Sequence, residues 1–279
     1  MFFASDNGSG AAPEIIAALT RANDGYARSY GADPIMARVK TLVRDLFEAP
    51  EAEVYLVATG TAANSLSIAL LTPPWAAVFA HADAHVAVDE CGAPEFFSAG
   101  AKMIGVAGDH GKMTPQSLTE ALSRVGEGGV HGVQRGMLTL TNVTEAGTVY
   151  TPAEIAALTA LAKAKGLPCH LDGARFANAL VATGATPAEM TWRAGIDALS
   201  FGGTKNGLML GEAVVVLHPD AAPHVPEAPP AVAVPEVKRE RRGRTALIIL
   251  AAVAVVAFAL VFGVRWLLSD AVSTDDAMV

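Results

Sequence analysis

The sequence predicts an α/β domain built on a mostly parallel, mixed sheet with helices on both faces. Two observations predict this class. Short apolar runs alternate with helical patterns along the first 219 residues, and the apolar runs lack the polar alternation of a strand that faces water. Strands buried on both faces and alternating with helices form parallel sheets, which bind ligands at the carboxyl ends of their strands.

The apolar runs predict seven strands, at residues 53–58, 76–80, 102–107, 136–141, 168–172, 198–201 and 213–217. Helical patterns between them predict helices over residues 61–71, 114–125, 151–166 and 173–184. Two of these segments open with Thr-Pro, where the hydroxyl caps the helix and proline takes the first helical position. Residues 151–166 also end with lysines and a glycine, which is typical of a helix C-terminus.

Composition excludes several classes of protein. The 20 Lys and Arg residues against 28 Asp and Glu residues argue against a nucleic-acid surface. The two cysteines, Cys91 and Cys169, make neither a disulfide framework nor a metal-ligand cluster, so we expect a reducing compartment and no metal site. The N-terminus has no basic segment followed by a long apolar run, so no secretory signal is predicted.

The C-terminal part of the chain has a different character. A proline-rich and basic linker is predicted over residues 220–244, a transmembrane helix over 245–268 and an acidic tail over 269–279. Residues 246–264 carry no charge, and the length of this uncharged run is close to the ~20 residues that cross a bilayer. A buried core helix is the alternative, but the basic block before the apolar run and Trp266 after it favour a membrane edge. Basic residues beside a membrane helix favour the cytoplasmic side, and here they precede the helix. The sequence therefore predicts that the N-terminal domain is cytoplasmic and anchored to the inner membrane.

Three motifs follow predicted strands and suggest a ligand site. "TGTAAN" at residues 59–64 is a glycine-containing turn that opens a helix, where free backbone N–H groups suit a phosphate, although such junctions are common. "DGAR" contains Asp172 and Arg175. The carboxylate of Asp172 suits either a helix cap or a contact with the ring nitrogen of a pyridine cofactor.

The third motif, "GGTKNG", places Lys205 in a loop. A salt bridge or a phosphate contact would explain this lysine, and so would a Schiff base formed by its amine. Its glycines would let a flat ring approach the backbone. An aspartate after one strand and a lysine after the next is the order expected of a pyridoxal-phosphate site.

The whole set of motifs resembles the low-specificity L-threonine aldolases, which are fold type I pyridoxal-phosphate enzymes of the β-eliminating-lyase group. The resemblance covers residues 2 to about 219, the large domain of that family, and implies that its smaller C-terminal domain is replaced here by the linker and the membrane helix. The stretches that carry it are "SDNGSGAAPEI", "YGADPIMARV", "VATGTAAN", "HADAHVAVDECGAPEFF", "LTNVTEAGTVYTPAE", "HLDGARFANAL" and "LSFGGTKNGLM".

The resemblance implies roles for individual residues. Lys205 would form the Schiff base with the cofactor, Asp172 would pair with its ring nitrogen, and His85 would stack on its ring. The phosphate would be held by Gly60, Thr61 and Ala62. Arg175 would lie beside the cofactor and the substrate carboxylate, which Ser5 would also contact. Glu90 would order His85 or an interface, and Tyr30 and Asp33 would lie near a subunit boundary.

The implied reaction cleaves L-threonine, L-allo-threonine and related β-hydroxy-α-amino acids to glycine and an aldehyde. The base that removes the β-hydroxyl proton could be His85, Glu145 or a water that they hold. The expected partners are a small-molecule amino acid and further copies of the chain, as a dimer or tetramer, with no nucleic acid. The alternative is a non-catalytic, pyridoxal-phosphate-binding remnant that acts as a membrane-tethered interaction protein.

Overall fold

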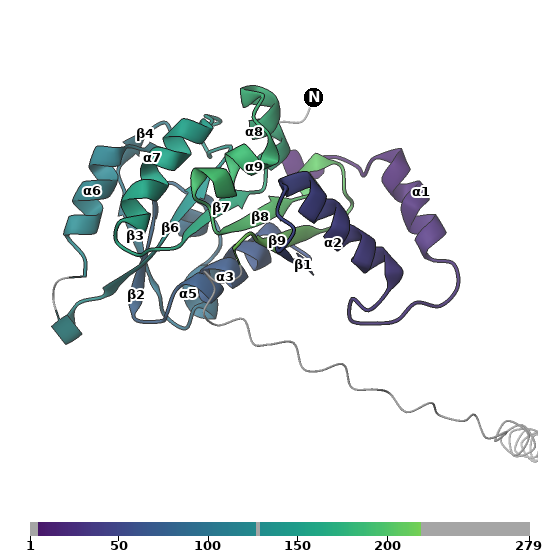
Figure 1. The fold of residues 1–279 in the computed structure, drawn as a ribbon, viewed down its shortest axis with the longest axis horizontal. Helices are drawn as coiled ribbons and strands as arrows, with labels where there is room; N and C mark the ends of the chain where they lie inside the picture. The colour runs from purple at the N-terminus through teal and green to yellow at the C-terminus, as the bar shows by residue number, and fades with distance from the viewer. Residues whose placement is uncertain (1–4, 127–128, 219–279) are drawn as a thin grey trace, which may run out of the picture. The chain divides into compact units, whose positions relative to one another are not determined.

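The predicted sheet is present in a computed structural model, which describes residues 5–126 and 129–218. Seven strands form one sheet in the order β1-β9-β8-β7-β6-β2-β3 (Figure 1). β9 runs antiparallel to both of its neighbours, β1 and β8, and the other adjacent pairs are parallel. The strands are β1 Glu53–Val57, β2 Ala76–His81, β3 Lys102–Val106, β6 Gln134–Thr141, β7 Cys169–Gly173, β8 Ala198–Gly202 and β9 Glu212–Val216.

All seven predicted strands are confirmed, and so is the mostly parallel, mixed sheet. A separate pair of short strands, β4 Gly108–Asp109 and β5 Lys112–Met113, is not among the predicted elements. The four predicted helices are also confirmed, as α3 Gly60–Leu71, α6 Pro115–Ser123, α7 Pro152–Lys163 and α8 Phe176–Thr183. The helices that were not predicted are α1 Pro13–Ala22, α2 Pro34–Phe47, α4 His85–Val88, α5 Ala93–Phe97 and α9 Pro187–Met190.

The Thr-Pro segments begin helices as the sequence predicts. The hydroxyl of Thr151 accepts a hydrogen bond from the N–H of Glu154 at 3.3 Å, and the Glu154 carboxylate accepts one from the N–H of Thr151 at 2.8 Å. Thr114 and Ser117 form the same reciprocal arrangement at the start of α6. Such capping satisfies N–H groups that have no acceptor within the helix.

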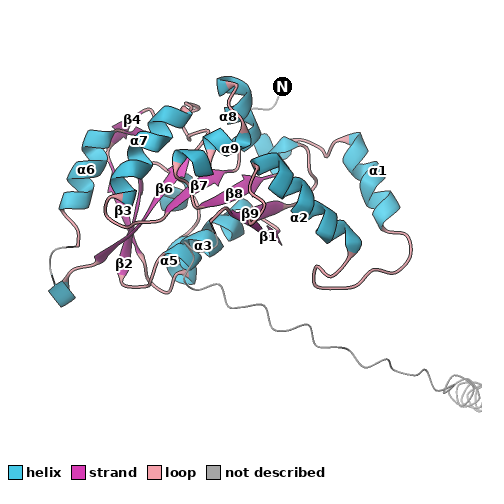
Figure 2. Cartoon of the chain, viewed as in Figure 1, coloured by secondary structure: helices cyan, strands magenta, loops and turns pink. Residues whose placement is uncertain are grey.

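Helices cover both faces of the sheet (Figure 2). On one face lie α3 and α5, and Ile68 and Leu71 of α3 are buried with Val78, Met137 and Val214 of the strands. The other face carries α2, α6, α7, α8 and α9. This double cover explains why the strands read as continuous apolar runs.

An aromatic cluster joins α2 and α8 to the sheet. The ring of Phe47 lies 5.7 Å from that of Phe176 and 5.4 Å from that of Phe201, between ring centroids. Phe176 and Phe201 are 5.9 Å apart and meet edge to face. The cluster fixes α2 against the strand that leads to Lys205.

Among the described residues, no helix is long and apolar enough to cross a membrane. The predicted linker at 220–244, transmembrane helix at 245–268 and tail at 269–279 lie outside the described residues. These segments therefore stay predictions.

Candidate active site

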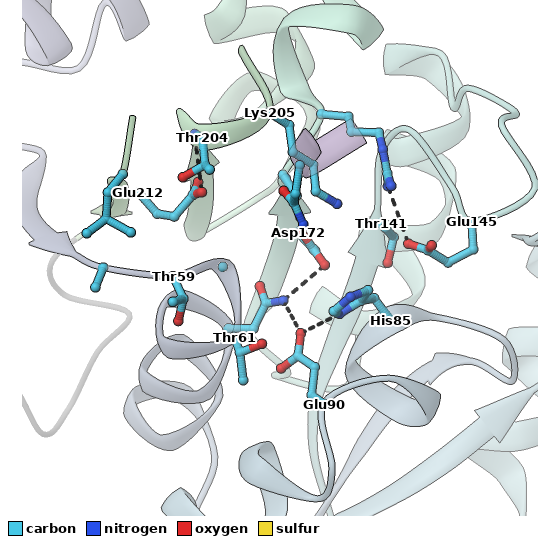
Figure 3. A pocket seen from close by; sticks show the side chains of 17 residues that line it. Thr59, Thr61, His85, Glu90, Thr141, Glu145, Asp172, Thr204, Lys205 and Glu212 are labelled. Carbon is cyan, nitrogen blue, oxygen red and sulfur yellow. Dashed lines mark hydrogen bonds and ion pairs between the residues drawn. The ribbon is translucent and has the colours of Figure 1, made fainter. Parts of the chain in front are cut away.

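A cavity of about 220 Å³ lies where the carboxyl ends of the parallel strands meet (Figure 3). The segments that follow β1, β2, β6, β7 and β8 line it, together with the first residue of β9. Eight of the residues named from the sequence line this one cavity: Gly60, Thr61, His85, Glu90, Glu145, Asp172, Arg175 and Lys205. Residues that follow separate strands in the sequence therefore meet in one place.

The N-terminus of α3 opens into the cavity at Gly60 and Thr61. A Cβ atom at Gly60 would meet no heavy atom within 4 Å, so the helix start faces free space. The first N–H groups of a helix have no intrahelical acceptor and attract anions. Ala62 differs from the prediction, because its N–H donates to the Thr59 hydroxyl at 3.1 Å and the residue does not line the cavity.

Asp172 is buried at the end of β7. Its Oδ1 accepts a hydrogen bond from the N–H of Ala174 at 3.1 Å, and its Oδ2 accepts one from Nδ2 of Asn64 at 3.0 Å. The helix-cap alternative is wrong, because Arg175 is the N-cap of α8 and that helix has no side-chain cap. Burial raises the pKa of Asp172 and the nearby Glu90 carboxylate adds to the rise, while the two hydrogen bonds oppose it.

His85 begins α4 and is fixed by a fully buried carboxylate. Its Nδ1 lies 2.8 Å from Oε1 of Glu90, whose side chain has no exposed surface. The hydrogen bond to Glu90 raises the pKa of His85, against the opposing effect of partial burial. The expectation that Glu90 orders His85 agrees with this contact.

Arg175 and Lys205 share an acidic partner, Asp6. Nε of Arg175 donates to Oδ2 of Asp6 at 2.6 Å, and Nζ of Lys205 lies 3.5 Å from Oδ1. Burial alone would raise the pKa of Asp6, but the Arg175 hydrogen bond and the charges of Lys205 and Arg175 outweigh it, so the pKa lies below its usual range. On its other side, Nη1 of Arg175 lies 3.6 Å from Oε1 of Glu145. The salt bridge considered for Lys205 from sequence is therefore present.

Ser5 is not brought to the cavity. Its hydroxyl accepts a hydrogen bond from the N–H of Asn7 at 3.2 Å and so caps the 3-10 turn Asp6–Gly8. The turn instead directs the neighbouring Asp6 toward Arg175 and Lys205.

Glu212, the first residue of β9, holds the Lys205 loop in place by hydrogen bonds. Its carboxylate accepts hydrogen bonds from the N–H of Gly203 at 2.8 Å and of Thr204 at 3.3 Å. A Cβ at Gly202 would collide with the backbone of Ala174, and one at Gly203 with Leu208 and the backbone of Gly211. These glycines therefore serve close packing of the chain on itself, rather than only the approach of a ring.

Sequence reasoning did not select Asn64, Glu212 or Asp6. Asn64 was signalled by its place in "TGTAAN", one turn into the helix 61–71, and Asp6 by its place in "SDNGSG". Glu212 precedes an apolar strand, but only the antiparallel direction of β9 brings it to this edge of the sheet. Strand direction leaves no mark on the apolar pattern.

Comparison with known proteins agrees with this geometry. The family described as Beta-eliminating lyase matches residues 3–266, which extends beyond the predicted domain end at residue 219. The chain is 48% identical over 221 residues to the low specificity L-threonine aldolase of Pseudomonas aeruginosa, covering 79% of this chain and 63% of the relative. It is 49% identical over 214 residues to the protein of the same name from a Pseudomonas species, covering 76% and 61%.

Among solved structures, a threonine aldolase of Leishmania major superposes with a TM-score of 0.73 at 32% identity, covering 79% of this chain and 63% of that one. The chain thus spans less than two thirds of the length of each of these three relatives. The resemblance to the low-specificity L-threonine aldolases is confirmed, and the matched residues extend over most of the sequence. The chain therefore belongs to the beta-eliminating lyase family.

Proposed function

We propose that this chain performs pyridoxal-phosphate-dependent cleavage of L-threonine, L-allo-threonine and related β-hydroxy-α-amino acids to glycine and an aldehyde. The observation that carries the proposal is one cavity in which the Lys205 amine, the buried Asp172 carboxylate, His85 and the N-terminus of α3 converge. The names of its relatives from Pseudomonas support the same reaction.

The residues in the cavity fit this cofactor. The start of α3 at Gly60 opens into free space and suits the phosphate. Asp172 is an acid that lines the cavity from a buried position and suits the ring nitrogen, and the Lys205 side chain, 15% exposed, supplies the amine. When bound, pyridoxal phosphate supplies an electron sink for the electron pair left when the Cα–Cβ bond breaks.

The side chains then divide the remaining work. Lys205 holds the cofactor covalently through Nζ, and Asp172 holds the proton on the ring nitrogen. Arg175 binds the substrate carboxylate with its guanidinium, which already binds a carboxylate in Asp6. His85 or Glu145 accepts the β-hydroxyl proton as the aldehyde leaves, and returning that proton to Cα gives glycine.

The test is an assay of the full chain with added pyridoxal phosphate and L-threonine. We expect acetaldehyde and glycine in equal amounts, and no product from Lys205→Ala. Lys40→Ala, which changes a lysine paired with Glu53 outside the cavity, is the matched control and should stay active. Cofactor binding without aldehyde would overturn the proposal and favour the non-catalytic, membrane-tethered alternative.

We also propose that residues 245–268 anchor the domain to the inner membrane with residues 1–219 on the cytoplasmic side. The uncharged run at 246–264 and the basic block before it support this proposal. The full chain should sediment with membranes, and a chain ending at Pro235 should not. A full chain that stays in the supernatant would contradict the anchor.

A homo-oligomer, dimer or tetramer, is the assembly that we propose. Apolar side chains along the N-terminal helices support it: Ile16, Leu19, Ile35, Leu42 and Leu46 are all exposed, as are Tyr26 and Tyr30. Asp33, expected near a subunit boundary, caps α2 by accepting from the N–H of Met36 at 2.9 Å. Light scattering of the purified chain should give a mass of two or four copies, and a monomer would contradict the proposal.

A further inference from the structure

The amide of Asn64 lies buried between two carboxylates. Its Nδ2 donates hydrogen bonds to Oε1 of Glu90 at 2.7 Å and to Oδ2 of Asp172 at 3.0 Å. The Asn64 side chain is part of α3, the helix whose N-terminus opens into the cavity. One NH₂ group therefore donates both to Asp172, the acid that would pair with the ring nitrogen, and to Glu90.

The orientation of this amide is set by its neighbours. Asn64 Oδ1 has no hydrogen-bond partner among the described residues, and turning the amide over would point that oxygen at two carboxylates. A buried acceptor without a partner costs free energy. Two donations to buried carboxylates, each stronger than a bond between neutral groups, hold the amide in place against that cost.

Four side chains are thereby joined in one hydrogen-bonded row. His85 Nδ1 contacts Glu90 Oε1, the same oxygen that accepts from Asn64, and Asn64 continues the row to Asp172. When His85 is protonated, it balances the charge of Glu90, and a protonated ring nitrogen would balance the charge of Asp172. Buried charges are tolerated when each is paired in this way.

The polar neighbours of Asn64 in the helix make no comparable contacts within the described part of the chain. Ser65 and Ser67 are equally buried, and their hydroxyls have no hydrogen-bond partner among the described residues. Asparagine also has a lower helix propensity than alanine or leucine. The distinctive property of Asn64 is its pair of donations to Glu90 and Asp172.

We propose that Asn64 is a positioning residue that aims the Asp172 carboxylate at the ring nitrogen of bound pyridoxal phosphate, while the Glu90–His85 pair fixes the Asn64 amide. This inference rests on the proposed function, since it requires the cofactor to bind in this cavity. Removing the Asn64 amide leaves Asp172 with the Ala174 N–H as its remaining hydrogen-bond donor among the described residues. A buried carboxylate with fewer donors takes up a proton more readily and then pairs less well with a protonated ring.

The experiment compares two cofactors on the full chain. One is pyridoxal phosphate, and the other is its 1-deaza analogue, in which a C–H group replaces the ring nitrogen. Dissociation constants are measured by equilibrium titration for the unaltered chain, Asn64→Ala and Asn64→Ser. Ser65→Ala is the matched control, because it removes a buried polar atom of α3 that makes no hydrogen bond to the described residues.

We expect Asn64→Ala to raise the Kd for pyridoxal phosphate about tenfold, the effect of losing one hydrogen bond to a charged group. The Kd for the deaza analogue should stay the same, and Ser65→Ala should change neither. Asn64→Ser keeps a hydrogen-bond donor in a smaller side chain. It should raise the Kd for pyridoxal phosphate by less than Asn64→Ala does and leave the Kd for the deaza analogue unchanged. This variant replaces Asn64→Ala in the test if Asn64→Ala does not fold.

An equal rise in the Kd of both cofactors in the Asn64 variants would show that Asn64 has a purely structural role and would overturn the inference. An unchanged Kd for pyridoxal phosphate in folded Asn64 variants would overturn it as well. Failure of the unaltered chain to bind pyridoxal phosphate would overturn the proposed function and this inference together. The two failures are therefore distinguishable.

Discussion

Asp6 and Arg175 are 169 positions apart in the sequence, yet Oδ2 of Asp6 accepts a hydrogen bond from Nε of Arg175 at 2.6 Å. This contact ties the N-terminal turn to the segment after β7 and places an anion on the guanidinium proposed to bind substrate. A substrate carboxylate must share Arg175 with Asp6 or displace it.

Asp6→Asn should therefore strengthen the binding of carboxylate ligands. The two anions compete for the same N–H donors, so removing one charge should lower the Kd of glycine a few-fold at low ionic strength. Titration of the cofactor-loaded chain with glycine measures this, and added salt should reduce the difference between the two proteins. A Kd that rises in Asp6→Asn would mean that Asp6 helps to build the site rather than competing for it.

Glu90→Gln should lower the pKa of His85. The Glu90 hydrogen bond raises that pKa in the folded chain, so protonated His85 adds stability that is complete at pH values below about 6.5, its pKa in an unfolded chain. This stability is lost as the pH rises through the raised pKa of the folded state. NMR titration gives the pKa directly, and the His85 signal is assigned by its loss in His85→Asn. The same His85 pKa in the unaltered chain and in Glu90→Gln would show that the Glu90 hydrogen bond does not raise it.

His170 should give the opposite dependence on pH. It is fully buried between the hydroxyls of Thr139 and Ser200, at 2.8 and 2.9 Å, and burial lowers its pKa to about 3. The unfolded chain takes up a proton near pH 6.5 and the folded chain does not, so stability falls as the pH drops from about 6.5 toward 3, by at most ~1.4 kcal/mol per pH unit. Urea unfolding at about pH 7 and about pH 5, on either side of the pKa of histidine in an unfolded chain, measures this. The free energy of unfolding should fall more between these two pH values for the unaltered chain than for His170→Gln. An equal fall in both proteins would contradict the prediction.

Phe47→Ala should destabilise the domain by about 3–5 kcal/mol, because it leaves a cavity beside Phe176 and Phe201. Phe96→Ala is the matched control, since that ring is 78% exposed and its loss should change the free energy of unfolding by less than about 0.5 kcal/mol. Chemical denaturation measures both values. Similar losses for the two variants would show that the aromatic cluster does not hold α2 in place.

Much of the sheet and the centre of the site could be predicted from sequence for one physical reason. Strands buried on both faces appear as apolar runs, and the carboxyl ends of parallel strands meet at one edge. Asp172 lies at the end of β7 and Lys205 follows β8, and these two strands are neighbours in the sheet. Their meeting therefore follows from the order of strands and motifs along the chain.

Other parts depend on geometry that the local pattern does not contain. The antiparallel direction of β9, which brings Glu212 to the site, follows from chain routing. The turn at residues 6–8 decides that Asp6 and not Ser5 faces Arg175. α2 was signalled by Asp33 before Pro34, a typical helix start, yet its place is fixed by long-range contacts such as that of Phe47 with Phe176.

Lys205 is proposed to hold pyridoxal phosphate through a Schiff base, which borohydride reduces to a stable bond. The full chain is incubated with pyridoxal phosphate, reduced, digested and examined by mass spectrometry for the lysine that carries the cofactor. We expect modification at Lys205 alone, at one cofactor for each chain, and none in Lys205→Ala. Modification of other lysines with Lys205 left free would contradict it.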